Sequence, residues 1–394
     1  MAHTRAQIQA ALGRELEEVF CVFDPEPCAS GSVAQVHRAI LRDSFLEERG
    51  LAGLPVREVA VKVVHPGVLD TTFVDLEILF RSFASINNVV VALGGPDIQI
   101  PFDRVEADRA MRHQLDLRWE ARNLARFSQN FAEDDGVVFP EVVLAASGVL
   151  VESWLEGETL DGLLARVQGA DFTEIHSESD AELATSEVSR EKRTALAHRI
   201  FDMTAKMYLR DNHVHGDLHA GNLLYSRAPN DHRVFVLDAG LTTALEQDST
   251  SPFGMLLHAL STGNSEGTTA QLLHLNTSKR PVDCARLHHE VADAIAAGKR
   301  SNSKAVNNMG AVVGSVLLAA QRAGVSIRGD VALSITTMSV SEGLIRQLDP
   351  SFDYAATALP YLIRYRATAR TARPSGQGSR SWKVAGMQVA GAAA

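Results

Sequence analysis

The pattern of apolar residues changes along this chain, and the change limits the folds that the chain can adopt. Before about residue 154 there are short runs of β-branched residues. Glu58–Val64 (EVAVKVV) predicts one strand, and Phe139–Trp154 predicts two more. From Thr194 the apolar spacing is helical, and the region beyond Asp248 has the pattern of helices and loops. Because 394 residues exceed the usual size of one domain, we expect an α+β fold of two lobes that meet near Trp154–Gly157.

The small strand-containing lobe is expected first and the mainly helical lobe second. The expected boundaries are residues 1–156 for the N-lobe, 157–360 for the C-lobe, and 361–394 for a basic, disordered tail. Within the C-lobe, Gln168–Arg193 is rich in acidic residues and lacks a helical stripe, which predicts a solvated insertion or loop. Helices are expected over residues 1–20, from about Val68, and over Val105–Phe131.

Charge is distributed unevenly along the chain. The overall formal charge is −10, so a general nucleic-acid-binding surface is not expected. After Asp353 six basic residues occur without any acid, so the residues up to Asp353 carry −16 and the tail carries +6. Basic residues near an anionic bilayer contribute about 1 kcal/mol each, so this tail could make a peripheral membrane contact. A solvated tail is the simpler interpretation.

Cysteine content and apolar runs exclude several classes of protein. Three cysteines (Cys21, Cys28 and Cys284) are too few for a disulfide framework, have no zinc-knuckle spacing and fit a reducing compartment. The first twenty residues lack the apolar core of a signal peptide and are too acidic for a clear transit peptide. The most apolar stretches, Val89–Leu93 and Gly310–Ala320, are shorter than the roughly 18–20 residues that span a bilayer, so no transmembrane helix is expected.

The strongest candidate for chemistry is the segment His215–Asn222 (HGDLHAGN), followed by Val236–Gly240 (VLDAG). An Asp, an Asn five residues later and a second Asp after a nearby strand are what MgATP chemistry requires. We assign Asp217 as the catalytic base for the attacking hydroxyl, and Asn222 and Asp238 as Mg²⁺ ligands. Each short motif alone would be an ordinary turn, but their joint occurrence favours a nucleotide site.

Lys62 lies in the middle of the predicted strand Glu58–Val64, where an ammonium group without a partner would be costly to bury. The pattern V-A-x-K is typical of kinases. In that pattern Ala60 would contact adenine and Lys62 would reach the α- and β-phosphates. A solvent-facing lysine on an edge strand is the alternative, and the downstream Asp/Asn/Asp set favours the kinase interpretation.

Such a lysine needs a carboxylate on a neighbouring helix, and Glu120 is the expected partner. Asp116, Glu120 and Asn123 share one face of the predicted helix, because they follow at spacings of four and three. The alternative is a solvated face, on which nearby arginines pair with these acids.

Further nucleotide contacts are expected from a loop and from a strand end. The small residues of the loop before Lys62 would let backbone N–H groups approach phosphate, although its spacing is not G-x-G-x-x-G and a plain turn would explain it. The predicted contacts are Ala29, Ser30, Gly31, Ser32, Val33, Glu152 and Trp154.

With these elements in order, the chain resembles the aarF-domain-containing (UbiB-type) atypical kinase family, and is most similar to its second animal-type branch. The resemblance covers roughly residues 10–360 and is carried by SGSVAQVHRA, VAVKVVHPGV, QLDLRWEARNLARF, HGDLHAGNLL, VLDAG and LDPSFD. It implies a protein-kinase-like fold that binds ATP with Mg²⁺, and an ATPase-like or small-molecule kinase activity. It also implies support of quinone (coenzyme Q) lipid biosynthesis, a lipid or quinone-precursor partner, and a mitochondrial or plastid location.

The sequence departs from the family pattern at three places. The nucleotide loop reads CASGS (28–32) rather than an alanine run, so nucleotide preference is expected to differ. Gln114 stands where the E-x-D motif has Glu, which leaves only Asp116. The K-x-G-Q helix that occludes the substrate cleft has no counterpart before Cys28. In addition, no A-P-E-like anchor follows Gly240, which argues against ordinary protein substrates.

Two other functions stay open. A small-molecule phosphotransferase of the aminoglycoside or choline kinase type also uses H-G-D-x-H-x-x-N, but would not be expected to carry SGSVAQVHRA or QLDLRWEARNL. A pseudokinase scaffold would bind nucleotide as a conformational ligand, but has no evident need for Asp217.

Overall fold

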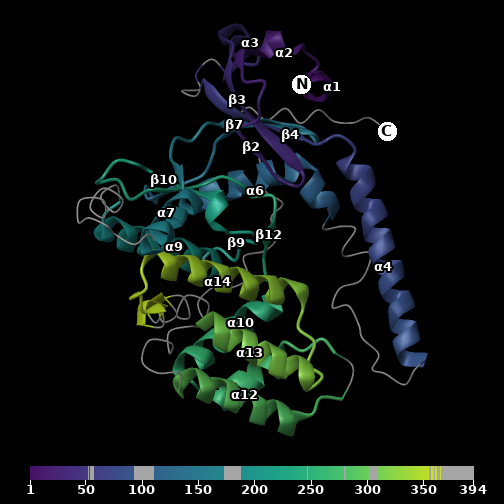
Figure 1. The fold of residues 1–394 in the computed structure, drawn as a ribbon, viewed down its shortest axis with the longest axis vertical. Coiled ribbons are helices and arrows are strands. Elements are labelled where there is room, and N and C mark those ends of the chain that lie inside the picture. Colours follow the sequence, from purple (N-terminus) through teal and green to yellow (C-terminus); the bar gives the residue numbers. More distant parts are fainter. Residues whose placement is uncertain are drawn as a thin grey trace.

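The computed structural model describes residues 1–51, 53, 57–92, 111–172, 188–245, 247–278, 281–300, 309–354, 356–358, 360, 361 and 364. A twisted sheet lies at one end of the molecule and a stack of helices at the other (Figure 1). The basic tail predicted over residues 361–394 falls almost entirely outside the described residues.

The first sheet is antiparallel and is built from the strand-forming runs of the first 153 residues. Its order is β1-β3-β4-β7-β6, with β2 paired to β3. The strands are β1 (Phe20–Phe23), β2 (Ala29–Ser30), β3 (Ala34–Leu41), β4 (Glu58–Val64), β6 (Val142–Ala145) and β7 (Val149–Ser153). The strand predicted over Glu58–Val64 is confirmed, and so are the two strands predicted within Phe139–Trp154.

One face of this sheet is covered by short helices. These are α1 (Ala2–Leu12), α2 (Leu16–Val19) and α3 (Asp43–Glu48). Val59, Val61 and Val63 of β4 are fully buried in the resulting apolar cluster, together with Ile8 of α1. The prediction of one helix over residues 1–20 is wrong, because Gly13 adopts the left-handed conformation (φ 67°) and ends α1, and Phe20 already belongs to β1.

Two helices follow the central strand. The helix expected from about Val68 is α4 (Val68–Ala92), which runs down one side of the molecule (Figure 1). The helix expected over Val105–Phe131 is interrupted: residues 111–115 are helical, and α6 (Leu117–Asn130) begins after Asp116. The Asp116 side chain accepts a hydrogen bond from the backbone N–H of Arg118, which is the geometry of a helix N-cap. Residues 105–110 lie outside the described residues.

Two small sheets and the remaining helices are built from residues between 137 and 348. One sheet has the order β5-β11-β10-β8, and the other pairs β9 with β12. The strands are β5 (Val137–Val138), β8 (Glu158–Thr159), β9 (Val214–His215), β10 (Leu223–Tyr225), β11 (Val234–Val236) and β12 (Thr242–Thr243). The helices are α7 (Leu160–Phe172), α9 (Arg190–Leu209), the 3-10 turn η1 (Ala220–Asn222), α10 (Gln247–Thr262), α11 (Ser265–His274), α12 (Cys284–Arg300), α13 (Met309–Arg322) and α14 (Gly329–Leu348).

The predicted acidic loop over Gln168–Arg193 is helical at both ends. Residues 168–172 continue α7, and residues 190–193 form the first turn of α9, which Ser189 caps by accepting from the backbone N–H of Lys192. Residues 173–187, which carry most of the acidic residues, lie outside the described residues.

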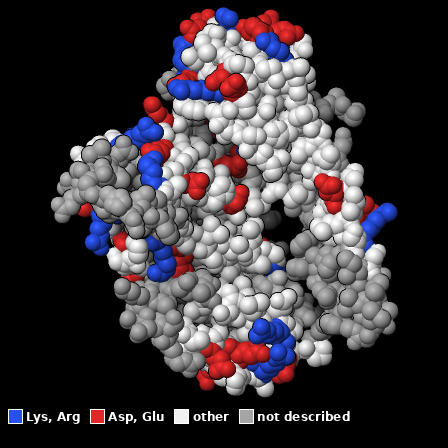
Figure 2. All heavy atoms as spheres, viewed as in Figure 1, with Lys and Arg blue, Asp and Glu red and all other residues white. Residues whose placement is uncertain are grey.

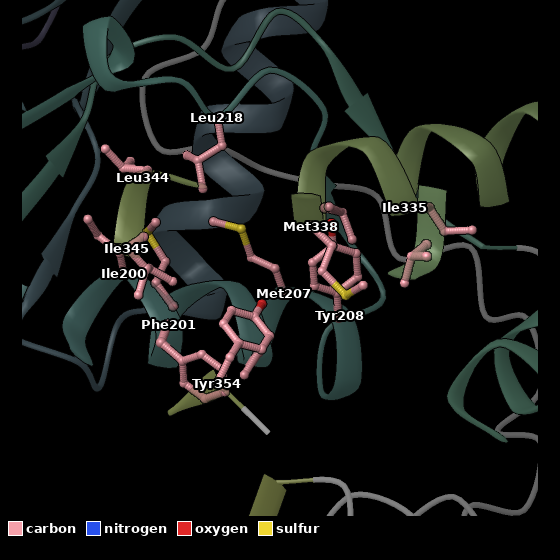
Figure 3. Packing of buried hydrophobic residues seen from close by; sticks show 14 of the residues in the cluster. Ile200, Phe201, Met207, Tyr208, Leu218, Ile335, Met338, Leu344, Ile345 and Tyr354 are labelled. Carbon is pink, nitrogen blue, oxygen red and sulfur yellow. The ribbon is translucent and has the colours of Figure 1, made fainter. Parts of the chain in front are cut away.

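Part of the larger apolar core lies between α9 and α14. Ile200, Phe201, Met207 and Tyr208 of α9 face Ile335, Met338, Leu344 and Ile345 of α14 (Figure 3). Leu218 points into the same core and is 1% exposed. This leucine directly follows Asp217, so the burial of one apolar side chain fixes the backbone next to the predicted catalytic base.

Within the part of the chain that the structure describes, no helix combines the length and apolar character needed to cross a bilayer.

We expect Leu218→Ala to lower the free energy of unfolding by about 2–5 kcal/mol, because it leaves a cavity in the core shared by α9 and α14. Leu318→Ala is the matched control. Leu318 is 55% exposed on α13, and its truncation is expected to change stability by less than about 0.5 kcal/mol. Urea denaturation of both variants measures the difference, and equal losses would contradict the anchoring of Leu218.

Candidate functional site

The ammonium group of Lys62 lies between two carboxylates. Its Nζ atom is 2.8 Å from both carboxylate oxygens of Glu120 and 2.7 Å from Oδ2 of Asp238. The Lys62 side chain is 13% exposed and that of Glu120 only 3%, whereas that of Asp238 is 37% exposed. The expected pair between Lys62 and Glu120 is present, and the cluster opens to solvent on the side of Asp238.

Three elements that are distant in sequence bring these charges together. Lys62 projects from β4 on the face opposite Val59, Val61 and Val63. Glu120 lies in the first turn of α6, which packs against β6 and β7. Asp238 follows β11, and its Oδ1 accepts a hydrogen bond of 2.8 Å from the backbone N–H of Gly240. On the face shown in Figure 2, acidic side chains gather near the middle of the molecule, below the sheet.

The helix that carries Glu120 also holds the segment after Asp238. Asn123 lies one turn further along α6, and its Nδ2 donates to the carbonyl oxygen of Ala239 at 2.8 Å. Asp116, which shares the predicted face, does not reach the cluster. It caps α6 and forms an ion pair of 2.7 Å with Arg118.

Burial and charge set the protonation of this cluster. Burial lowers the pKa of Lys62, but the charges of Glu120 and Asp238 outweigh it, and the pKa ends above the ordinary lysine value. Burial alone would raise the pKa of Asp238, but the nearby ammonium and the Gly240 N–H hold it below the ordinary value. For Glu120 burial dominates and raises the pKa, against the opposing charge of Lys62.

His215 connects the segment of Asp217 to the segment of Asp238. Its Nδ1 accepts a hydrogen bond of 3.1 Å from the backbone N–H of Asp217, so its Nε2 carries the proton and donates to the carbonyl oxygen of Asp238. Burial lowers the pKa of His215, which keeps the ring neutral as this arrangement requires. The hydroxyl of Thr337 on α14 donates to the carbonyl oxygen of Gly216 at 3.1 Å and adds a second tie.

Asn222 is held close to both acids through the backbone. Its side-chain Nδ2 donates to the backbone carbonyl oxygen of Asp217 at 2.9 Å. Its own backbone carbonyl oxygen accepts from the N–H of Leu237 at 3.0 Å. The carboxylate of Asp217 is 58% exposed, with Nε2 of His219 at 3.8 Å. A solvent-facing carboxylate here is accessible to an incoming hydroxyl group or water.

The donor set fits a magnesium ion. A carboxylate oxygen of Asp238 and the amide oxygen of Asn222 are hard ligands, and Mg²⁺ needs only one or two from the protein when phosphates and water supply the rest. Among the described residues, no group of three or more His, Cys, Asp and Glu side chains could hold a metal ion by itself. One carboxylate and one amide oxygen from the protein leave the other positions around such an ion to phosphate and water.

The predicted phosphate loop packs against the end of the lysine strand. Ala29 and Ser30 form β2, and the N–H of Gly31 donates to the carbonyl oxygen of Ala34 at 2.9 Å, which closes a tight turn. Nε2 of His65, three residues after Lys62, lies 3.0 Å from the carbonyl oxygen of Gly31 and 3.3 Å from the Ser30 hydroxyl. No sequence pattern indicates a role for His65 or His215, because the hydrogen bonds that they make join separate loops.

The two predicted contacts in β7 and directly after it have different surroundings. The indole of Trp154 stacks on the guanidinium group of Arg38, which lies across from Ala60 on β3, at 4.8 Å. Glu152 is 6% exposed and lies directly across from Ala60 in the pairing of β7 with β4. Side chains of directly paired residues lie on the same face, so Glu152 shares the face of Ala60 and Lys62.

Comparison with known proteins gives one family match and several relatives. The family model of the ABC1 atypical kinase-like domain matches residues 1–272. Proteins named "Probable protein kinase UbiB" are similar to this chain. The one from Aliivibrio salmonicida is 26% identical over 367 residues (92% of this chain, 61% of that protein), and the one from Pseudomonas aeruginosa is 27% identical (91% and 61%). The "Probable serine/threonine-protein kinase abkC" of Dictyostelium discoideum is 23% identical (89% and 56%).

The chain thus spans about three fifths of the length of these curated relatives. Among solved structures, a complex of Rv3197 with erythromycin from Mycobacterium tuberculosis is 20% identical, with a TM-score of 0.57, and the match covers 88% of this chain and 79% of that one. At this identity the likeness shows the fold. The predicted kinase-like α+β fold is confirmed by the family match and this likeness.

We expect Lys62→Met to lower the free energy of unfolding by about 3–5 kcal/mol near neutral pH, because it leaves two carboxylates close together without their cation. Burial then raises the pKa of both carboxyls in the folded state. A folded state that binds more protons gains stability as pH falls, so the loss should shrink from about pH 8 to about pH 5.

Lys206→Met is the matched control, since the Lys206 ammonium also lies 2.6 Å from two carboxylates, those of Asp134 and Asp202. Arg199 remains beside Asp134 after this change, so a smaller loss with little pH dependence is expected. Chemical denaturation at several pH values measures both. A pH-independent loss for Lys62→Met would contradict the expectation.

Proposed function

The chain belongs to the ABC1 atypical kinase-like (aarF/UbiB) family, and on this premise we propose that it binds MgATP and transfers or hydrolyses its terminal phosphoryl group. The observation that supports this most directly is the joining of Lys62, Glu120 and Asp238 in one cluster. The segment of Asp217 and Asn222 is hydrogen-bonded to the same cluster through His215.

In this proposal each side chain has a separate task. Asn222 and Asp238 would hold Mg²⁺, which neutralises phosphate charge when bound. Lys62 contacts the α- and β-phosphates, and Glu120 fixes the direction of the lysine. The loop of Ala29–Val33 covers the phosphates with backbone N–H groups, and Ala60 contacts the adenine.

The Asp238 carboxylate has two competing demands. In this structure it accepts from the ammonium of Lys62, yet the proposed metal needs the same oxygen atoms. Phosphate oxygens can replace Asp238 as acceptors for the lysine, because Glu120 continues to hold the other side of the ammonium group. Arrival of the nucleotide therefore frees the carboxylate for the metal.

Asp217 is the proposed base. Its backbone N–H is fixed by His215 and the next side chain, that of Leu218, is buried, while its own carboxylate is exposed. A base held in this way can accept the proton of an attacking hydroxyl group or orient a water molecule.

The wider role that we propose is support of quinone lipid metabolism, with a lipid or quinone precursor as partner and a mitochondrial or plastid location. The support for this role is the likeness to proteins named UbiB over nine tenths of this chain. Contact of the basic tail with an anionic membrane is part of the same proposal.

We expect MgATP to raise the melting temperature of the protein progressively with ligand concentration, because a ligand that binds only the folded state stabilises it. Asp238→Asn should remove the dependence of this rise on Mg²⁺. Asp293→Asn, at an exposed position of α12, is the control and should retain it. An unchanged Mg²⁺ dependence in Asp238→Asn would exclude the metal assignment.

Asp217→Asn should spare the thermal shift but lower ATP turnover by about 10²–10⁴-fold, the usual contribution of a positioned base. Turnover is measured with and without anionic lipid vesicles and a phenolic quinone precursor. Undiminished hydrolysis in the variant would exclude Asp217 as base. Transfer of phosphate to a hydroxylated metabolite instead of the phenol would favour a small-molecule phosphotransferase.

A further inference from the structure

Glu152 has an environment that the ion-pair cluster does not explain. The residue is only 6% exposed, and its Oε2 atom has no hydrogen-bond partner among the described residues. A buried polar atom without a partner is costly for a folded protein, and such atoms commonly mark a place where a ligand or water completes the bonding. Since none of the described residues supplies this partner, we expect a ligand or a water molecule to do so.

The charges around Glu152 favour its neutral form. Burial raises its pKa well above the ordinary value, the carboxylate of Glu120 on α6 adds to this, and Asp238 acts in the same direction. Lys62 on β4 opposes them, but its ammonium group is already bonded to both of the other acids. A neutral carboxyl group has one O–H donor and one carbonyl acceptor side by side.

The position of Glu152 relative to Lys62 indicates which part of a nucleotide it meets. Glu152 is paired with Ala60, and Leu150 is paired with Lys62. Two residues along a strand correspond to about 7 Å. If Lys62 marks the phosphates, as the proposed function states, Glu152 lies further along the same face, next to the small side chain of Ala60, where the base would lie.

We propose that Glu152 selects the nucleobase, by accepting a hydrogen bond from the N6 amine of adenine and donating one to the ring nitrogen N7. This inference rests on the proposed function. Adenine presents an amine donor beside a ring-nitrogen acceptor, whereas guanine presents two acceptors, O6 and N7, at the corresponding edge. A neutral carboxyl group, with one donor and one acceptor, matches the edge of adenine. Against guanine, its carbonyl oxygen would face an acceptor of the base and form no hydrogen bond with it.

An ionised Glu152 would make the opposite choice. A carboxylate accepts two hydrogen bonds and would suit the amide and amine N–H groups of guanine on its Watson–Crick edge. That form would place a third negative charge beside Glu120 and Asp238, with one ammonium group among them. The arrangement of charges therefore favours adenine.

The test compares affinities for MgATP and MgGTP, by calorimetry, in the wild type and two variants. The wild type should bind ATP at least about 10-fold more tightly than GTP, in line with the discrimination of a two-point hydrogen bond. Glu152→Gln keeps one donor and one acceptor in the same shape and should retain the preference. Glu152→Leu removes both and should bring the ratio close to one. Glu266→Leu, at an exposed position on α11, is the control and should behave as wild type.

Base analogues give a second measurement, in the wild type and in Glu152→Leu. With wild type, 7-deaza-ATP lacks the ring-nitrogen acceptor of one edge and purine riboside triphosphate lacks the amine. Each should bind about 5–50-fold more weakly than ATP if Glu152 reads the N6/N7 edge. In Glu152→Leu, which is expected to fold because a buried unpaired carboxyl is replaced by an apolar group, the analogues and ATP should bind alike.

The outcomes separate the two proposals. If no nucleotide binds the wild type, the proposed function itself fails. If ATP and GTP both bind and their ratio is the same in wild type and Glu152→Leu, nucleotide binding stands and base selection by Glu152 is overturned. Retention of the ATP preference in Glu152→Leu, or its loss in Glu152→Gln, contradicts the hydrogen-bond pattern.

Discussion

The buried ammonium group of Lys62 is the interaction on which the rest of the site depends. A lysine inside a strand of valines is tolerated only if carboxylates compensate its charge, and here they come from two other parts of the chain. Glu120 is 58 residues away and Asp238 is 176 residues away, so satisfying one charge brings the sheet, α6 and the segment after β11 together. His215 and Asn123 then hold the backbone carbonyl groups of Asp238 and Ala239.

Much of this could be predicted from the sequence, because the residues concerned break local rules. A lysine in EVAVKVV and two acids in short polar motifs are visible without coordinates, and the strand pattern around Lys62 gave its bounds correctly. The Lys62–Glu120 pair could be predicted as well, since a buried cation needs an anion on a neighbouring helix. The roles of these residues in catalysis stay predictions.

Other features depend on backbone geometry that no periodic pattern encodes. The expected first helix ends at Gly13 and the expected long helix is interrupted at Asp116, in each case because one residue favours a helix end over helix continuation. The bond between Lys62 and Asp238, and the two-sided bonding of the His215 ring, join residues across loops. The charge environment of Glu152 follows only once β7 is paired with β4.

The packing of α6 has a consequence for how the molecule can move. Leu117, Ala121, Leu124 and Phe127 belong to the large helical core, whereas Glu120 on the same helix bonds the lysine of the sheet. Moving the sheet away from the helices would break the ion pair between Lys62 and Glu120 and leave two buried charges without partners. A rotation of the sheet about this pair keeps the ion pair intact. The two halves of the molecule are therefore expected to move as a hinge with Lys62 and Glu120 on its axis, so that α2 and α3, at the outer end of the sheet (Figure 1), have the largest amplitude.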